Sequence, residues 1–357
     1  MGMKRRMGAL AAPAAALLLA SCGGGDTGWL CPLWVPSDVL AVDIDGDGRT
    51  DVVTVAQLAS SASQREGRIV VRRQTAPGAF AAPQTCLAGK FPWKAAAEDM
   101  DGDGAPDLVL DSHLTGETGA TLLLQDGARP GTFQPPSPIA LPGDASAVAV
   151  GDLDGDGRED VLARVVLSRT GSISTTALGV LRQRPDGALS PWEELPSAQS
   201  GVLSRLLAAT DVNGDGTRDV AEFLAPQSTD YRARITTLAQ TPGGGGFARV
   251  DSSLADVRGI DDAVAADLDG DGRADFATVG FYPGGTSLNI LQQQDGTGEF
   301  RLLRTVPMPI SDSRVAAGDL DADGLCDLVV LGSDNRVFVM GQSTSAPGTF
   351  TEPRFLD

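Results

Sequence analysis

A nine-residue acidic cluster occurs six times along this chain of 357 residues, and its spacing constrains the fold more than any other feature. The first copy, residues 43–51, reads Asp-Ile-Asp-Gly-Asp-Gly-Arg-Thr-Asp, and the others begin at Asp99, Asp152, Asp211, Asp267 and Asp319. Successive copies start 56, 53, 59, 56 and 52 residues apart. Self-similarity at such a period indicates a repeat array in which each repeat is one supersecondary unit.

Each acidic cluster lies between two short apolar runs that read as strands, such as residues 39–42 before the first cluster and 160–165 from the end of the third. A third run follows in each copy, and then a Gly-containing turn closed by an apolar residue. That closing residue is Phe80, Phe133, Leu189, Phe247, Phe300 or Phe350. A fourth extended stretch comes next. The pattern lacks helical periodicity, so it predicts four short strands per repeat.

Six repeats of four antiparallel strands predict an all-β fold, a β-propeller of six blades. Blades arranged around an axis leave only short, protected sheet edges. A seven-bladed ring is the alternative. However, only seven residues follow Phe350, and residues 23–38 are too short for a four-stranded blade. Residues 29–35 could instead add a strand that closes the ring.

The six clusters have the composition of metal-binding loops. Calcium takes six to eight oxygen ligands, and acids at alternate positions can point inward where glycines permit a sharp turn. In the first loop we expect side-chain oxygens from Asp43, Asp45, Asp47 and Asp51 and the carbonyl oxygen of Arg49. An unoccupied turn, in which Asp and Asn only cap the backbone, is the alternative.

The corresponding ligand sets predict up to six calcium ions, one per loop. They are Asp99, Asp101, Asp103, Ala105 and Asp107; Asp152, Asp154, Asp156, Arg158 and Asp160; Asp211, Asn213, Asp215, Thr217 and Asp219; Asp267, Asp269, Asp271, Arg273 and Asp275; and Asp319, Asp321, Asp323, Leu325 and Asp327. The seventh position of each loop contributes its carbonyl oxygen. Asn213 replaces an acid in the fourth loop, and Ala322 stands in the sixth where the other loops have Gly.

These repeats resemble the FG-GAP or VCBS family, whose best-known propeller is the head of integrin α chains. The resemblance covers about residues 28–357, and the Phe-Gly and Gly-Ala-Pro elements are only partly present, as in Ala-Pro-Gly-Ala-Phe at 76–80. It implies calcium loops on one face of the ring and ligand-binding loops on the other. On that second face we expect Trp93, His113, Tyr231, Phe281 and Tyr282 to contact a ligand, with core packing as the alternative for each.

The N-terminus has the features of a targeting segment. Three basic residues at 4–6 precede an apolar run that ends in small residues, which indicates a signal peptide over residues 1–21. The ending Leu-Ala-Ser-Cys resembles the bacterial lipobox, which implies lipidation of Cys22, a tether over 22–28 and the propeller over 29–357. A secretory signal without lipidation is the alternative. Because Gly23 follows Cys22, the resemblance favours the outer membrane or cell surface as the place of this lipid-anchored envelope protein.

Three further cysteines would lie in a compartment that permits disulfides. Cys31 precedes the first cluster by 12 residues and Cys86 precedes the second by 13, so the two could pair. Cys326 lies inside the sixth cluster. Spacing alone does not decide the connectivity.

Net charge and residue usage limit the classes of function that we expect for this chain. The formal net charge is −19 and no basic patch is present, which argues against nucleic acid as a partner. The chain has one His and no phosphate-cradling loop, dinucleotide fingerprint or zinc spacing, so we do not expect an enzyme. The expected function is a binding or adhesion module for a glycan or protein ligand. A lyase-like, polysaccharide-degrading propeller and a purely structural envelope component are the alternatives.

Overall fold

The computed structural model describes residues 34–355 except 59–65, 91, 113–118, 171–172, 197–205, 225–231, 242–245, 259, 283–284, 295–296, 310–313, 333–335 and 347. The predicted signal peptide and tether, Cys22, Cys31, His113 and Tyr231 therefore lie outside the described residues. The part of the chain that is described contains no helix suited to crossing a bilayer.

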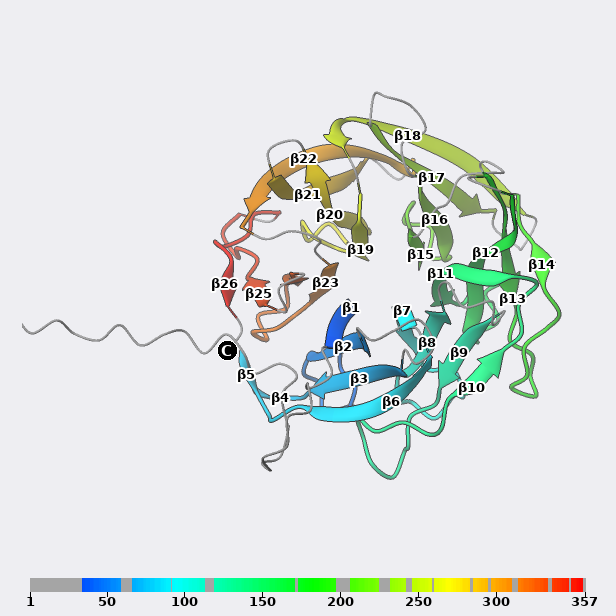
Figure 1. Cartoon of the computed structure of the whole chain (residues 1–357). Coiled ribbons are helices and arrows are strands. Elements are labelled where there is room, and N and C mark those ends of the chain that lie inside the picture. Colours follow the sequence, from blue (N-terminus) through cyan, green and yellow to red (C-terminus); the bar gives the residue numbers. More distant parts are fainter. Residues whose placement is uncertain are drawn as a thin grey trace, which may run out of the picture.

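The chain forms six four-stranded antiparallel sheets, arranged as blades around a central axis (Figure 1). Blade one contains β1 (Trp34–Val42), β2 (Asp51–Leu58), β3 (Glu66–Arg72) and β6 (Gln84–Lys90); β4 (Gln74–Ala76) and β5 (Ala79–Phe80) form a small hairpin beside it. Blade two contains β7 (Pro92–Glu98), β8 (Asp107–Ser112), β9 (Ala120–Leu123) and β10 (Ser137–Ile139). Blade three contains β11 (Asp144–Gly151), β12 (Asp160–Thr170), β13 (Ile173–Leu181) and β14 (Glu193–Glu194).

The other three blades repeat this order. Blade four contains β15 (Leu206–Thr210), β16 (Asp219–Leu224), β17 (Arg232–Gln240) and β18 (Phe247–Arg258). Blade five contains β19 (Asp262–Ala266), β20 (Asp275–Tyr282), β21 (Gly285–Gln294) and β22 (Glu299–Met308). Blade six contains β23 (Arg314–Gly318), β24 (Asp327–Leu331), β25 (Val337–Met340) and β26 (Arg354–Phe355). The predicted all-β propeller of six four-stranded blades is confirmed.

The hydrophobic core lies between the blades. Second strands such as β2 and β24 are buried along nearly their whole length because neighbouring blades cover both faces of each sheet. Buried apolar side chains form six clusters, and each cluster joins two adjacent blades. The cluster that closes the ring packs Val39 and Val52 of blade one against Val329 and Leu331 of blade six.

Only the end of the segment expected to close the ring lies within the described residues. Trp34 and Val35 begin β1, which is the inner strand of blade one and pairs with β2. A closing strand from residues 29–33 stays a prediction. Every described blade consists of strands that are local in the sequence. In the described part of the chain, the ring closes through packing and hydrogen bonds between blades six and one.

The first strand of each blade lines the central axis. Residues from β1, β7, β11, β15, β19 and β23 enclose a cavity of about 220 Å³, whose lining is mostly Ala, Val and Leu. Three charged residues also line this cavity. The Nζ atom of Lys94 in blade two lies 3.0 Å from Oδ1 of Asp38 in blade one and is also paired with Asp262 in blade five. Because blades two and five are opposite each other in a ring of six, this ion pair spans the cavity.

Candidate metal centres

Each acidic cluster forms the loop that joins the first and second strands of its blade. We call them loops one to six, covering residues 43–51, 99–107, 152–160, 211–219, 267–275 and 319–327, and number the positions in each from one to nine. Since the same connection recurs in all six blades, the loops share one face of the ring. The other ends of the inner strands, including the cross-cavity ion pair, lie toward the opposite face.

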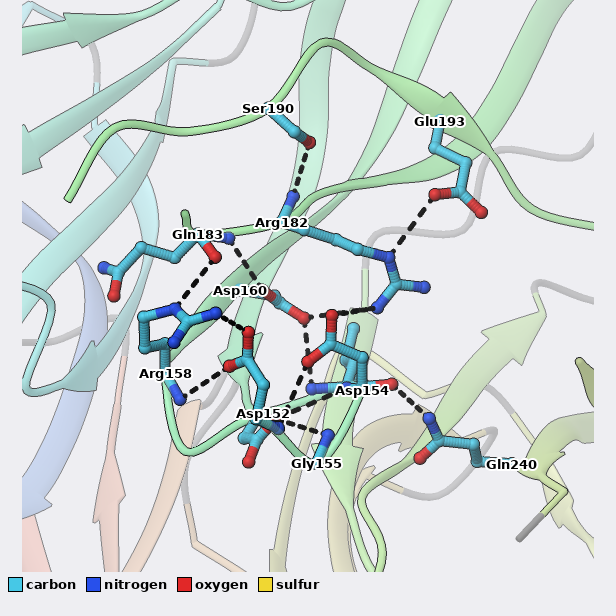
Figure 2. A network of polar contacts seen from close by, with 12 residues as sticks. Asp152, Asp154, Gly155, Arg158, Asp160, Arg182, Gln183, Ser190, Glu193 and Gln240 are labelled. Carbon is cyan, nitrogen blue, oxygen red and sulfur yellow. Dashed lines mark hydrogen bonds and ion pairs between the residues drawn. The ribbon is translucent and has the colours of Figure 1, made fainter. Parts of the chain in front are cut away.

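The aspartate at position one shapes each loop from within. In loop one, Oδ1 of Asp43 accepts the backbone N–H of Asp47 at 3.1 Å and Oδ2 accepts that of Gly48 at 2.7 Å. In loop three, Asp152 accepts the N–H groups of Gly155 and Gly157 at 2.7 and 2.8 Å (Figure 2). The chain can wrap this tightly because the glycines at positions four and six take positive φ, 72° and 82° in loop one.

The aspartate at position nine begins the second strand and is fully buried. In loop three, Oδ2 of Asp160 accepts the N–H of Leu153 at 3.2 Å and Oδ1 accepts the N–H of Gln183 at 2.8 Å (Figure 2). The equivalent pair of bonds occurs at Asp51, Asp107, Asp219 and Asp327. Position nine therefore ties the loop to the end of the third strand of its own blade.

Five of the loops bring three carboxylates into one group, with one oxygen from each within 4.8 Å of the others. The groups are Asp43, Asp45 and Asp51; Asp99, Asp101 and Asp107; Asp152, Asp154 and Asp160; Asp267, Asp269 and Asp271; and Asp319, Asp321 and Asp327. In loop four, Asn213 supplies an amide oxygen at position three, and Asp211 holds the same backbone bonds as its counterparts. The predicted positions one, three and nine thus converge in four loops.

Position five lies outside the three-carboxylate group in four of the five loops that form one, and its role as a metal ligand stays a prediction. Asp47 and Asp156 pair with the arginines at position seven, Arg49 and Arg158, and are outside the three-carboxylate groups of loops one and three. In loop five, Asp271 pairs with Arg273 and also belongs to the group. An arginine at position seven therefore offsets part of the loop charge, which the Asp spacing alone does not reveal.

Burial raises the pKa of the carboxyl groups at position nine, and neighbouring carboxylates add to the effect. Burial raises the pKa of Asp51 to about 6, with repulsion from Asp45 and Asp43 adding to the effect and the N–H of Gln74 opposing it. Burial likewise raises the pKa of Asp107, Asp160 and Asp219 to about 6 and that of Asp275 to about 7. A cation among these groups would relieve both the burial cost and the repulsion.

The donor chemistry fits a hard divalent cation. All side-chain donors in the groups are carboxylate oxygens, which Ca²⁺ and Mg²⁺ prefer. In loop one, Oδ1 of Asp45 is buried and has no hydrogen-bond partner among the described residues, so it carries an unused acceptor. A buried acceptor that meets neither water nor a donor is costly, and a bound cation would satisfy it.

Comparison with known proteins identifies the repeats. The family of FG-GAP-like repeats matches residues 43–110, 109–163 and 267–330, which together are more than half of the chain. The chain belongs to this family. Each FG-GAP match includes at least one of the six acidic loops. No curated protein matches the sequence significantly.

Several solved structures are similar to this FG-GAP chain at low sequence identity. A protein of unknown function from Dyadobacter fermentans DSM 18053 is 14% identical with a TM-score of 0.53, and the alignment covers 89% of this chain and 93% of that one. A rhamnogalacturonan lyase from Bacillus licheniformis is 13% identical with a TM-score of 0.38, over 90% of this chain and 69% of the lyase. The structure described as the Dos1 propeller is 13% identical with a TM-score of 0.45, over 89% and 69%. At 14% identity, the likeness to the Dyadobacter fermentans protein shows the fold alone.

A set of six buried glutamines in the FG-GAP repeats was not predicted from the sequence. Their backbone N–H groups donate to Oδ1 of position nine in the same blade, at 2.6 to 2.9 Å. They are Gln74, Gln125, Gln183, Gln240, Gln293 and Gln342. Each also pairs across its turn with the closing apolar residue, from Phe80 to Phe350. A glutamine recurring after every third strand was the signal that could have found them.

Three of the five aromatic residues expected to bind a ligand lie within the described residues, at the strand ends opposite the acidic loops. Trp93 is near the start of β7, half-buried, with the Arg314 guanidinium 5.4 Å from its ring centre. Phe281 and Tyr282 end β20, and the structure describes only their backbone. His113 and Tyr231 lie outside the described residues. For all five residues, the role as ligand contacts stays a prediction.

The cysteines of the described region are half-buried. Cys86 lies in β6, and its predicted pairing with Cys31 stays a prediction because Cys31 is outside the described residues. Cys326 occupies position eight of loop six. Burial raises the pKa of its thiol, and the nearby carboxylates of Asp267, Asp327 and Asp319 raise it further, so the thiolate form is disfavoured.

Proposed function

We propose that this FG-GAP propeller is a calcium-binding, non-catalytic binding module of the bacterial cell surface, with a glycan or protein as its ligand. The observation that carries the proposal is the recurrence of convergent carboxylates in five loops, with oxygens within 4.8 Å of one another. A lipid anchor at Cys22 would hold the propeller at the membrane. Its support is the lipobox-like ending of the apolar N-terminal run.

The residues that would hold calcium are those at positions one, three and nine, with position five and the carbonyl of position seven completing the set. Bound calcium would supply positive charge that offsets the carboxylate repulsion. Magnesium demands a tighter octahedron and dehydrates reluctantly, so irregular loops rich in carboxylates favour the larger ion. Within the protein, position one fixes the turn and position nine joins the loop to the blade, so ligand geometry and blade packing depend on the same side chains.

Two features support binding rather than catalysis. The loops place their acids where backbone N–H groups already engage positions one and nine, which suits a structural site. The single His of the chain, His113, limits general acid–base chemistry by imidazole. The ligand is expected on the opposite face, at the strand ends that carry Trp93, Phe281 and Tyr282, where aromatic side chains serve as anchors for sugars or partner chains.

Thermal melting of the mature domain tests the metal site. After chelation, we expect calcium to raise the melting temperature in a concentration-dependent way and magnesium to raise it much less. Extracellular modules bind calcium at about 0.1 to 1 mM, and calcium at ten times the dissociation constant stabilises by about 1.4 kcal/mol per independent site. Elemental analysis should find several calcium ions per chain. A melting curve indifferent to chelator and calcium, with less than one calcium per chain, would show that the loops are only polar turns.

The non-catalytic part of the proposal has its own control. Calcium-loaded protein should bind members of a glycan array saturably and leave them unchanged. Release of unsaturated oligosaccharides from an acidic polysaccharide would instead identify the lyase alternative.

A further inference from the structure

The glutamine at or just beyond the end of each third strand is buried, with at most 8% exposed in any of the six. Its backbone already serves its own blade by donating to position nine. A buried primary amide must also find partners for its side-chain N–H and C=O groups. The acceptor of each side-chain amide therefore shows which segments of the ring the glutamine connects.

Four of the amides cross to the preceding blade. Nε2 of Gln74 donates to the carbonyl of Leu320 at 2.9 Å, and Nε2 of Gln183 donates to that of Met100 at 2.5 Å. Gln240 and Gln342 make the equivalent bonds to Leu153 and Leu268. Figure 2 shows the amide of Gln240 reaching loop three from the next blade. In every case the acceptor is position two of a metal loop.

Position two is the residue between two of the candidate ligands, at positions one and three. In loop three, Leu153 donates its N–H to Asp160 of its own blade and accepts a hydrogen bond from Gln240 of blade four at its carbonyl. Its side chain is fully buried in the cluster between blades three and four. The peptide groups that set the positions of Asp152 and Asp154 are thus fixed from both blades.

Two blades lack the crossing bond and provide an internal comparison. Nε2 of Gln125 donates instead to the carbonyl of Pro106 in its own blade, at 2.8 Å. The side-chain amide of Gln293 has no hydrogen-bond partner among the described residues. By their place in the ring, these two glutamines adjoin loops one and four.

We propose that Gln74, Gln183, Gln240 and Gln342 are positioning residues for calcium, each holding the metal loop of the preceding blade in its ligand-binding conformation. The inference rests on the proposed calcium function and adds a mechanism to it. A loop held in place gives up less conformational freedom when the ion binds, and so binds more tightly. The calcium affinities of loops six, two, three and five therefore depend on the neighbouring blade, whereas those of loops one and four do not depend on this bond.

The variant Gln240→Met tests this, because Met has a similar length and volume but no N–H donor. Hydrogen exchange read by mass spectrometry during a calcium titration gives a separate midpoint for each loop. We expect the midpoint for residues 152–160 to rise about threefold to tenfold, as the loss of one net hydrogen bond implies. The midpoint for residues 43–51 should stay the same.

The matched control is Gln293→Met, which changes an equally buried glutamine at the same place in blade five. We expect it to leave the midpoint for residues 211–219 within about twofold. Gln183→Met should act on residues 99–107 and supplies an independent case if Gln240→Met does not fold. An unchanged midpoint at residues 152–160, or an equal shift in all six loops, overturns the inference while the calcium proposal stands. Wild-type loops whose exchange ignores calcium overturn both.

Discussion

Ala322 occupies a backbone conformation that the equivalent position of every other loop gives to glycine. Its φ is 63°, and it is the one described residue other than glycine with positive φ. The left-handed region costs an L-residue about 1 to 2 kcal/mol, partly offset by the greater backbone entropy that glycine loses on folding. We expect Ala322→Gly to raise the free energy of unfolding by about 0.5 to 1 kcal/mol, measured by urea denaturation.

The reverse change in loop one is the control for Ala322. A Cβ added at Gly46, where φ is 72°, would meet nothing within 4 Å, so the effect of Gly46→Ala is conformational rather than steric. That variant should lose about as much stability as Ala322→Gly gains. Equal stability of Ala322→Gly and the wild type would show that loop six carries no such strain.

Single residues differ in how readily the sequence reveals them. The convergence of the carboxylates could be predicted because positions one to nine are contiguous and each loop forms its own hydrogen bonds. The crossing bonds could not, because Gln74 and its acceptor Leu320 lie 246 residues apart and only the closed ring brings them together. The pairing of Asp156 with Arg158 was also missed, although the two are neighbours, because the choice between metal and arginine is electrostatic rather than a matter of spacing.

At the scale of elements, the pairing of β7 with β8 is irregular, and a carboxylate side chain accepts two backbone N–H groups at the irregularity. Their register shifts between Pro92 and Ala95, and Oδ1 of Asp111 accepts the N–H groups of Trp93 and Lys94 at 3.0 and 2.7 Å. Burial raises the pKa of Asp111 to about 7; Asp38 adds to this, and the two N–H groups and the Lys94 charge oppose it. The positions of strands can be predicted from apolar runs in the sequence, whereas an irregularity of this kind cannot.

This buried carboxyl group makes stability depend on pH. Between an unfolded pKa of 3.8 and the folded value of about 7, the folded protein holds a proton that the unfolded chain has lost. The free energy of unfolding therefore falls as pH rises through that window. Asp111→Asn keeps an acceptor for both N–H groups and cannot ionise. Between about pH 5 and pH 7.5 the wild type should lose about 2 kcal/mol more stability than the variant.

The wild type and Asp111→Asn can be compared directly, because the acidic loops titrate equally in both proteins. Urea denaturation at the two pH values, with chelator present, gives the four free energies needed. Parallel pH profiles of wild type and Asp111→Asn would show that Asp111 is ionised in the folded protein throughout this range.

At the scale of the whole molecule, the number of blades could be predicted by counting repeats, but the way the ring closes could not. Each repeat forms one blade whose four strands are local in sequence, so the number of repeats equals the number of blades. Closure depends on surfaces from the two ends of the array, and nothing in a single repeat encodes their contact. The Lys94 ion pair across the axis could not be predicted either, because Lys94 and Asp262 are 168 residues apart in the sequence.

The cross-axis ion pair should contribute strongly to the stability of the ring. Asp38 and Asp262 are 3% and 0% exposed, and Lys94 is the cation paired with both, so Lys94→Met would leave two buried carboxylates without it. Removing one partner of a buried ion pair typically costs about 3 to 5 kcal/mol. We expect a loss of that size in urea denaturation at about pH 7.

The triple variant Lys94→Met, Asp38→Asn, Asp262→Asn should recover much of the lost stability, because neutral side chains of similar shape remove the uncompensated charge. The new amide at position 262 keeps an oxygen that can accept the backbone N–H of Val315, as the Asp262 carboxylate does. A loss below about 1 kcal/mol in the single variant would mean that water reaches these carboxylates and that the axis is open at this end.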